Sequence, residues 1–364
     1  TSILLCIKRI LPLLFHSTAS FRTTKKFTMP SLTLPLPVVN TPQKIQLSRI
    51  SHVYHEHPDL AKFKAFAQDF GFEEVGEVDG KIYYRGYGKD PYIHVASKSK
   101  GTGKEFGGAA FLAKTEEDFE KAAALPNAVK SDLSKAPGGG KMVSIPIPSG
   151  CHIHVVFGQQ EREPARVVVS KTEVHKGAFN TSYEKARKGE FQRFKTGPAM
   201  IHKLGHLGFI SKMWDQDVAF YTETFNFVPS DVLHAPGNAD MDVMTFLHLD
   251  LGEEYSDHHT LFVARAPPDM PATIMHHTSY EVDDFDTQLL GHEHLLGKGY
   301  DLVWGVGRHV LGSQIFDYWK DPSGFTIEHY ADGDLVNVHT QVLRQEDQGP
   351  NTLSVWGPDL PEVF

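Results

Sequence analysis

The stretch WKDPSGFTIEHYAD (residues 319–332) sets the fold prediction, because its pattern occurs a second time in the first half of the chain. There, IPIPSGCHIHVVFG (145–158) aligns Pro148-Ser149-Gly150 with Pro322-Ser323-Gly324. A turn followed by a short apolar strand occurs at both places. The match predicts that the chain consists of two homologous halves.

A longer repeat surrounds this motif. Each copy contains a short strand, an amphipathic helix that ends at glycine, and further strands. In the first copy, Leu60, Phe63, Phe66, Ala67 and Phe70 fall on one helical face, and Gly71 follows as the C-cap. The pattern predicts an α+β fold with two such modules in each half. The four copies begin within residues 50–72, 106–122, 204–227 and 275–300.

Changes in composition divide the chain into five parts. Residues 1–28 contain no acidic residue and begin at Thr1, so they are expected to be either an organellar presequence or read-through of untranslated sequence, with Met29 as the true start. The second interpretation is favoured. The expected parts are a presequence or disordered extension (1–44), a first domain (45–160), a polar linker (161–199), a second domain (200–340) and a Pro/Gly-containing tail (341–364).

The composition excludes several classes of protein. The chain has 364 residues, of which 40% are apolar and 22% charged, as in globular proteins. Its net charge of −9 argues against a nucleic-acid partner, and no apolar run reaches the ~20 residues of a membrane helix. Two cysteines give no disulfide framework, which favours the cytoplasm, or mitochondria if residues 1–28 are a presequence. The 21 histidines suggest metal chemistry.

Three residues of the second half are candidate metal ligands. His206 in GHLGF and His277 in HHTSY occupy the same position of the repeat, and Glu328 follows the Pro-Ser-Gly turn. Since strand residues alternate between faces, all three are expected to project to one side. Two imidazoles and one carboxylate are the ligand set of non-haem Fe(II) oxygenases, and they leave three positions for a chelating substrate and O2.

The first half provides an internal comparison. Its equivalent positions are His52, Gly108 and His154. Glycine has no side chain to bind a metal, and the carboxylate is missing. We therefore expect the first domain to be a metal-free scaffold.

The stretch GRHVLGSQIFDYWKDPSGFTIE (307–328) resembles the signature of the extradiol catechol dioxygenases, a family of the vicinal oxygen chelate superfamily that also contains glyoxalase I. The signature contains Gly-x-His, then Tyr, Asp-Pro-x-Gly and Glu. Asp317 departs from it, because an aliphatic residue is expected before Tyr318. The resemblance extends over residues ~45–340. It implies two tandem vicinal-oxygen-chelate domains, each with two βαβββ modules in an open, barrel-like sheet.

The resemblance also assigns roles to residues. His206, His277 and Glu328 fall on the metal ligands of the family, and Tyr318 and His309 fall on its tyrosine and histidine beside the substrate. The run DHHTLFVA supplies a further histidine, for which His259 is preferred and His258 stays possible. A neutral imidazole can take a proton from the catechol and later return it. Tyr318 can donate to a catecholate oxygen, and His309 would orient Tyr318 or the substrate.

The expected activity is ring cleavage of a catechol next to the diol. Fe(II) would be the cofactor, with Mn(II) as the alternative, and O2 the cosubstrate. Both oxygen atoms would enter a muconic semialdehyde-type product. We expect a homo-oligomer with a small-molecule catecholic substrate and no nucleic-acid or membrane partner. Trp304 stands where one branch of the family has a carboxylate-binding arginine, which favours an uncharged ring substituent.

Three alternatives remain within the same superfamily. The first is an oxygenase like 4-hydroxyphenylpyruvate dioxygenase, which normally ends in a long helix. The tail GPNTLSVWGPDLPEVF (349–364) is instead rich in proline and predicted not to be helical. The others are a glyoxalase-like metalloenzyme and a non-enzymatic binding protein. The tail itself either packs on the outer surface or lies across the mouth of the barrel.

Overall fold

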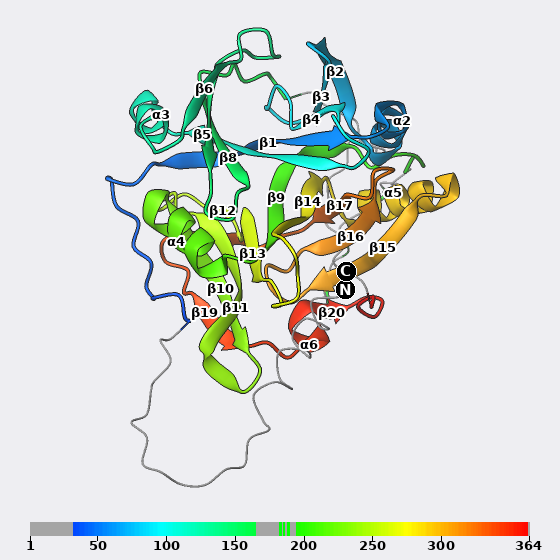
Figure 1. Cartoon of the computed structure of the whole chain (residues 1–364). Helices are drawn as coiled ribbons and strands as arrows, with labels where there is room; N and C mark the ends of the chain where they lie inside the picture. Colours follow the sequence, from blue (N-terminus) through cyan, green and yellow to red (C-terminus); the bar gives the residue numbers. More distant parts are fainter. Residues whose placement is uncertain (1–31, 165–181, 184, 186–187, 190–193, 363–364) are drawn as a thin grey trace, which may run out of the picture.

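The computed structural model describes residues 32–164, 182–183, 185, 188–189 and 194–362 (Figure 1). The expected α+β fold is confirmed: two large curled sheets, of eight and ten strands, carry helices between their strands. Each sheet is built from two strand–helix–strands modules. The proposed presequence, residues 1–28, and much of the proposed linker lie outside the described residues.

The first sheet has the strand order β2-β3-β4-β1-β5-β8-β7-β6. Its first module consists of β1 (Leu47–His57), α2 (Leu60–Phe70), β2 (Glu73–Val78), β3 (Lys81–Arg85) and β4 (His94–Lys98). Its second module consists of β5 (Glu105–Ala113), α3 (Glu116–Ala123), β6 (Val129–Asp132), β7 (Lys141–Pro146) and β8 (His152–Phe157).

The second sheet has the strand order β19-β10-β11-β13-β9-β14-β17-β16-β15-β20. One module consists of β9 (Ile201–Ser211), α4 (Trp214–Thr224), β10 (Phe227–Ala235), β11 (Asn238–Leu249) and β13 (Leu261–Arg265). The other consists of β14 (Ile274–Val282), α5 (Phe285–Lys298), β15 (Asp301–His309), β16 (Ile315–Lys320) and β17 (Thr326–Ala331). A small separate sheet joins β12 (Ser256–Asp257) to β18 (Leu335–Val336).

The register of the central strands relates the two halves residue by residue. In the first sheet, His52 on β1 pairs with Ala110 on β5; in the second, His206 on β9 pairs with Ser279 on β14. Ala110 and Ser279 in turn pair with residues of β8 and β17. The resulting counterparts are His52 and His206, Gly108 and His277, and His154 and Glu328.

The helices follow the expected pattern at their buried faces but not at all of their ends. In α2, Phe63, Phe66 and Phe70 are buried, and Gly71 adopts a left-handed φ of 104°, with its N–H directed at carbonyls of the last turn. Helix α5 also ends at a left-handed glycine. The expectation of a terminal glycine is wrong for α3 and α4. Ala124 after α3 stays right-handed, and the residue after α4 is already extended toward the next strand.

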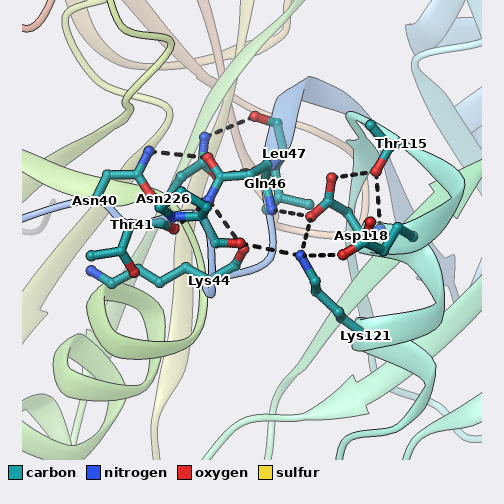
Figure 2. A network of polar contacts seen from close by, with 11 residues as sticks. Asn40, Thr41, Lys44, Gln46, Leu47, Thr115, Asp118, Lys121 and Asn226 are labelled. Carbon is teal, nitrogen blue, oxygen red and sulfur yellow. Dashed lines mark hydrogen bonds and ion pairs between the residues drawn. The ribbon is translucent and has the colours of Figure 1, made fainter.

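Residues 32–47 connect the two halves through hydrogen bonds (Figure 2). The side-chain amide of Asn226 accepts from the Leu47 N–H and donates to the Leu47 C=O, both at 2.9 Å. The Gln46 N–H donates to Asp118, which also caps the start of α3 with Thr115. Residues 32–44, which were grouped with the extension by composition, therefore contact both halves; Leu34 N–H, for example, donates to the Asp242 carboxylate at 2.7 Å.

Further contacts fix the second sheet against the first. His94 Nδ1 lies 2.7 Å from the Tyr280 hydroxyl on β14. On β17, His329 Nε2 donates to the Phe70 carbonyl at 2.8 Å, and the two rings stack with centroids 3.7 Å apart. Strands β14 and β17 also carry His277 and Glu328, so the first half supports the strands that hold two candidate ligands.

The tail belongs to the second sheet. Strand β19 (Leu343–Glu346) pairs with β10, and β20 (Ser354–Trp356) pairs with β15. The expectation that the tail contains no helix is wrong for α6 (Pro350–Leu353), a single turn. Proline is tolerated in a first turn because the N–H that it lacks would have no helical partner there. None of the helices in the described ranges is long and apolar enough to cross a membrane.

Candidate metal centre

Three neighbouring strands of the second sheet bring the predicted ligands together. His206 lies on β9, His277 on β14 and Glu328 on β17, and the strand order β9-β14-β17 places them side by side. Glu328 Oε2 lies 3.2 Å from His206 Nε2 and 3.7 Å from His277 Nε2. All three side chains are buried, with at most 5% of the residue surface exposed.

The chemical state of this group suits a divalent metal ion. One ligand atom from each residue lies within 4.8 Å of the others. His277 Nε2 has no hydrogen-bond partner among the described residues. Burial, reinforced by neighbouring histidines, holds the pKa of His277 well below its usual value, so the imidazole is neutral and has a lone pair to donate. Two imidazoles and a carboxylate fit iron or manganese.

The group opens on a largely apolar cavity. Aromatic and aliphatic side chains form much of its wall, and the described residues that line it include neither lysine nor arginine. Arg308, a candidate anion-binding residue in this region, instead donates to the Ser313 carbonyl and to the Asp332 carboxylate. The apolar lining residues are Met244, Phe246, Phe262, Trp304, Leu311 and Leu353.

His259, the preferred proton-transfer residue, lines the cavity, with its ring centroid 4.2 Å from that of His206. His258 does not line it; its Nε2 lies 2.7 Å from Asp231 Oδ2 and its Nδ1 lies 3.1 Å from His259 Nδ1. If an ionised Asp231 accepts from His258, a neutral His258 must accept from His259 Nδ1–H. This chain leaves His259 Nε2 as a proton acceptor. Burial lowers the pKa of His259 well below its usual value.

Tyr318 and His309 contact each other at the opposite wall. His309 Nε2 lies 3.0 Å from the Tyr318 hydroxyl, and His309 Nδ1 lies 2.8 Å from the Leu353 carbonyl. A carbonyl only accepts, so Nδ1 carries the proton and Nε2 accepts from Tyr318. The tail therefore fixes the tautomer of His309. Burial and the Glu328 carboxylate raise the pKa of Tyr318, which keeps the phenol protonated.

Asp317, the departure from the family signature, points away from the cavity because it alternates with Tyr318 on β16. Its carboxylate lies 2.9 Å from His292 Nδ1 on α5 and accepts from Trp319 Nε1 at 2.8 Å. Burial raises the pKa of Asp317. The carboxylate thus connects the sheet to α5. The face of β16 that carries Tyr318 toward the cavity does not contain it.

His276, which was not among the candidate residues of the sequence analysis, also lines the cavity, and its Nδ1 lies 2.6 Å from His277 Nδ1. The hydrogen bond between the two rings orients a predicted ligand. Gln314, Thr352 and Leu353 complete the wall and were likewise not predicted. The consecutive histidines of the run MHHT were the available signal for His276.

The equivalent position of the first half is filled by hydrogen-bonded side chains. His52 Nε2 lies 3.0 Å from the Tyr54 hydroxyl, and His154 Nε2 donates to the Gly107 carbonyl at 2.7 Å. Tyr54 faces Gly108, whereas its counterpart Gly208 faces His277. In the first half Tyr54 pairs with Gly108, whereas in the second half the ring of Phe262 occupies the space beside Gly208 and His277.

Comparison with known proteins agrees with this geometry. A family model for the Glyoxalase/Bleomycin resistance protein/Dioxygenase superfamily matches residues 203–329. Metapyrocatechase 2 of Cupriavidus necator is 30% identical over 178 residues, which cover 49% of this chain and 51% of that protein, so the match spans about half of that relative. Biphenyl-2,3-diol 1,2-dioxygenase of Metapseudomonas furukawaii is 24% identical over 305 residues, covering 82% and 89%.

A solved structure shows the same fold. Homoprotocatechuate 2,3-dioxygenase from Brevibacterium fuscum, in a complex with 3,4-dihydroxyphenylacetate, aligns with a TM-score of 0.69 at 14% identity, covering 89% of this chain and 93% of that one. This likeness shows the fold. Residues 203–329 resemble the Glyoxalase/Bleomycin resistance protein/Dioxygenase superfamily. The relatives that the chain resembles are named as a metapyrocatechase and as biphenyl-2,3-diol dioxygenases.

Proposed function

We propose that this chain is an extradiol ring-cleaving dioxygenase that uses Fe(II) held by His206, His277 and Glu328. It would insert both atoms of O2 into a catechol next to the diol and release a muconic semialdehyde-type product. The observation that carries the proposal is the buried group of two imidazoles and a carboxylate at an apolar cavity that also contains His259 and Tyr318. Fe(II), when bound, would be chelated by the two oxygens of the catechol and would couple oxidation of the ring to reduction of O2. Mn(II) suits the same ligands.

His259 would serve as the proton acceptor and later the donor. A catechol must lose at least one proton to chelate a metal ion, and the neutral His259 imidazole borders the cavity in which the diol would lie. With His258 Nε2–H donating to an ionised Asp231, His259 Nδ1–H would donate to His258 Nδ1 and leave His259 Nε2 to receive this proton. After ring opening begins, the resulting imidazolium can return the proton to a developing oxyanion.

Tyr318 would stabilise the ionised substrate. In the free protein its hydroxyl donates to His309 Nε2, and a short rotation about the C–O bond directs the same proton to a catecholate oxygen. His309, fixed by the Leu353 carbonyl, would keep the phenol ring in place for this change. Tyr318 is fully protonated at neutral pH because burial raises its pKa.

The wall of the cavity favours a catechol with an uncharged aryl or alkyl substituent. Trp304, Met244 and Phe246 offer apolar contacts, and Arg308 is engaged in contacts with Ser313 and Asp332. A carboxylate on the ring would lose hydration without gaining a cationic partner among the described lining residues. We further propose a homo-oligomer located in the cytoplasm, to be examined by light scattering and cell fractionation.

The test begins with anaerobic loading of Fe(II), followed by catechol and O2. The appearance of the yellow semialdehyde, with one O2 consumed per catechol, is the expected result. Alkyl- or arylcatechols should exceed 3,4-dihydroxyphenylacetate in kcat/KM by ~10-fold or more, the cost of an unpaired buried charge being several times RT. Turnover of 4-hydroxyphenylpyruvate without cleavage of any catechol would contradict the proposal.

A further inference from the structure

A second group of buried histidines lies in the first half, outside the site described above. His55 and His57 alternate on β1 and so face the same side, and His94 lies on the adjacent strand β4. One ring nitrogen from each lies within 4.8 Å of the others, and no residue of the three is more than 1% exposed. This histidine cluster meets the same geometric condition as His206, His277 and Glu328.

The cluster has ring nitrogens without partners. His57 Nδ1 lies 2.9 Å from the Ser323 hydroxyl, and His94 Nδ1 lies 2.7 Å from the Tyr280 hydroxyl. The Nε2 atoms of both rings, and both nitrogens of His55, have no hydrogen-bond partner within the described ranges. Buried polar atoms normally have partners, because leaving them unpaired destabilises the fold. His57 and His94 match the arrangement of a metal-binding histidine, in which one nitrogen is held by a neighbouring group and the other is left for the ion.

The cluster is uncharged. Burial lowers the pKa of all three histidines, that of His57 to about 3, so their imidazoles can bind a metal without first losing protons. Two charged groups act on it. Asp321 Oδ2 lies 3.6 Å from His57 Nδ1, and the Lys104 ammonium helps to lower the pKa of His55 and of His57. The carboxylate favours a bound cation and the ammonium disfavours it, so the two charges oppose each other at this position.

The repeat shows that the fold does not require histidines here. The register of β1 with β4, and of β9 with β13, assigns each member of the cluster a counterpart in the second half. The counterparts of His55, His57 and His94 are Phe209, Ser211 and Leu261. Phe209 and Leu261 are buried hydrophobic residues. In the second half these positions are thus mainly filled by hydrophobic packing, whereas in the first half they hold three imidazoles that converge on one point.

We propose that His55, His57 and His94 form a second metal site that takes Zn²⁺ or a similar divalent transition ion. Three neutral imidazoles are a common zinc ligand set, and a water molecule can complete a tetrahedral ion. Ser323 and the stacked ring of Phe325 tie the cluster to the turn before β17, the strand of Glu328. A bound ion would therefore connect the first sheet to the strand that carries a catalytic ligand. The expectation of a metal-free first domain then holds only for His52, Gly108 and His154.

The first experiment measures zinc binding in full-length chains that cannot bind metal at Glu328. A His206→Ala/Glu328→Ala double variant should retain one equivalent of Zn²⁺ per chain after dialysis, by elemental analysis. Adding His94→Leu, the residue of the counterpart position, should remove that equivalent, whereas adding His154→Gln should not. Circular dichroism checks that each variant is folded. Absence of zinc from the double variant, or its retention after His94→Leu, would overturn the proposal.

The second experiment keeps the native ligands of the candidate active site. In the iron-loaded protein, Zn²⁺ at ~100 times its dissociation constant should raise the melting temperature by about 5 °C, because it binds only the folded chain. His55→Phe should abolish this rise, and His154→Gln should preserve it. An equal rise in His55→Phe would refute the site. Both readouts are independent of dioxygenase activity, so the proposed function can fail while the zinc site stands, or the reverse.

Discussion

Both halves of the molecule hold a buried histidine on a central strand, His154 on β8 and His277 on β14, and use it differently. In the first half, His154 Nδ1 and Nε2 are both hydrogen-bonded, to Ser144 and to the Gly107 carbonyl. In the second half, His277 Nε2 faces Glu328 without a hydrogen-bond partner among the described residues. The comparison teaches that saturation of hydrogen bonds, rather than the presence of histidine, separates a structural position from a candidate ligand.

The largest effect is expected from the ligands themselves. Glu328→Ala or His277→Ala should reduce bound iron to background and activity by more than ~10³-fold, since loss of even an outer partner of a ligand costs ~10–100-fold. His52→Gln and His154→Gln are the matched changes in the first half and should leave iron content and kcat unchanged. Elemental analysis and catechol turnover measure both. Loss of iron in His154→Gln would show that the two halves are not functionally distinct.

The next effect separates proton transfer from metal binding. His259→Ala should keep its iron and lose turnover by ~10²–10⁴-fold, the size of a general acid–base contribution. Electron-poor catechols, which ionise without help, should recover part of the loss. His258→Gln, which removes only the neighbour of His259, should lose ~10-fold or less because the acceptor nitrogen remains. If His259→Ala loses its iron instead, His259 is a ligand or a structural residue.

A smaller effect on substrate affinity is expected from the tail. The strands of the tail pair with the second sheet, so the first half offers no matched change. Deletion of residues 351–364 removes the Leu353 wall and carbonyl, and also the Pro358 carbonyl that accepts from Trp304. We expect KM to rise by ~10-fold and iron to oxidise faster as water enters, with a change in melting temperature below ~3 °C.

A pair of point variants sharpens the result for the tail. Leu353→Ala should reproduce part of the rise in KM, whereas Val355→Ala, at a residue 62% exposed, should not. Unchanged substrate and oxidation kinetics, together with a lower melting temperature in the deletion, would mean that the tail only straps the outer surface.

The smallest effect on activity is expected from changes at His154. The protonation of this residue should instead make the free energy of unfolding depend on pH. Burial lowers the pKa of His154 to about 4, whereas the unfolded residue titrates near 6.5. Below pH 6.5 the unfolded chain therefore takes up a proton that the folded chain does not, and stability falls as the pH falls toward 4. At pH 5 this histidine costs about 2 kcal/mol.

Urea unfolding at pH 7 and pH 5 measures that contribution. The wild type should lose about 2 kcal/mol more stability between these pH values than His154→Gln, with equal kcat at pH 7. Equal losses in the two proteins would show that His154 is accessible to protons in the folded state, and its assignment as a hydrogen-bonded structural residue would fail.

The repeat and the residues on its central strands could be predicted from the sequence, because alternation within a strand is a local property. His206, His277 and Glu328 come together as expected for that reason. The pairing of Asp317 with His292 could not be predicted, because it depends on how α5 packs across β16.

Other features depended on tertiary contacts in the same way. Leu353 reaches the cavity only because β20 pairs with β15. The alternating histidines 55 and 57 were visible in the sequence, but their convergence with His94 needs the parallel pairing of β1 with β4. The sequence pattern therefore did not predict contacts that depend on pairing between strands far apart in the chain.

The exchange of Tyr54 for Gly208 at equivalent positions has a consequence for descent by duplication. A histidine introduced at Gly108 would overlap His154, and the left-handed φ of 112° there strains any side chain. The phenol of Tyr54 already fills the adjacent room. A copy of the second-half ligand set in the first half would therefore need changes at 108 and 154 and a smaller residue at 54. A single mutation at any one of these positions does not produce that ligand set.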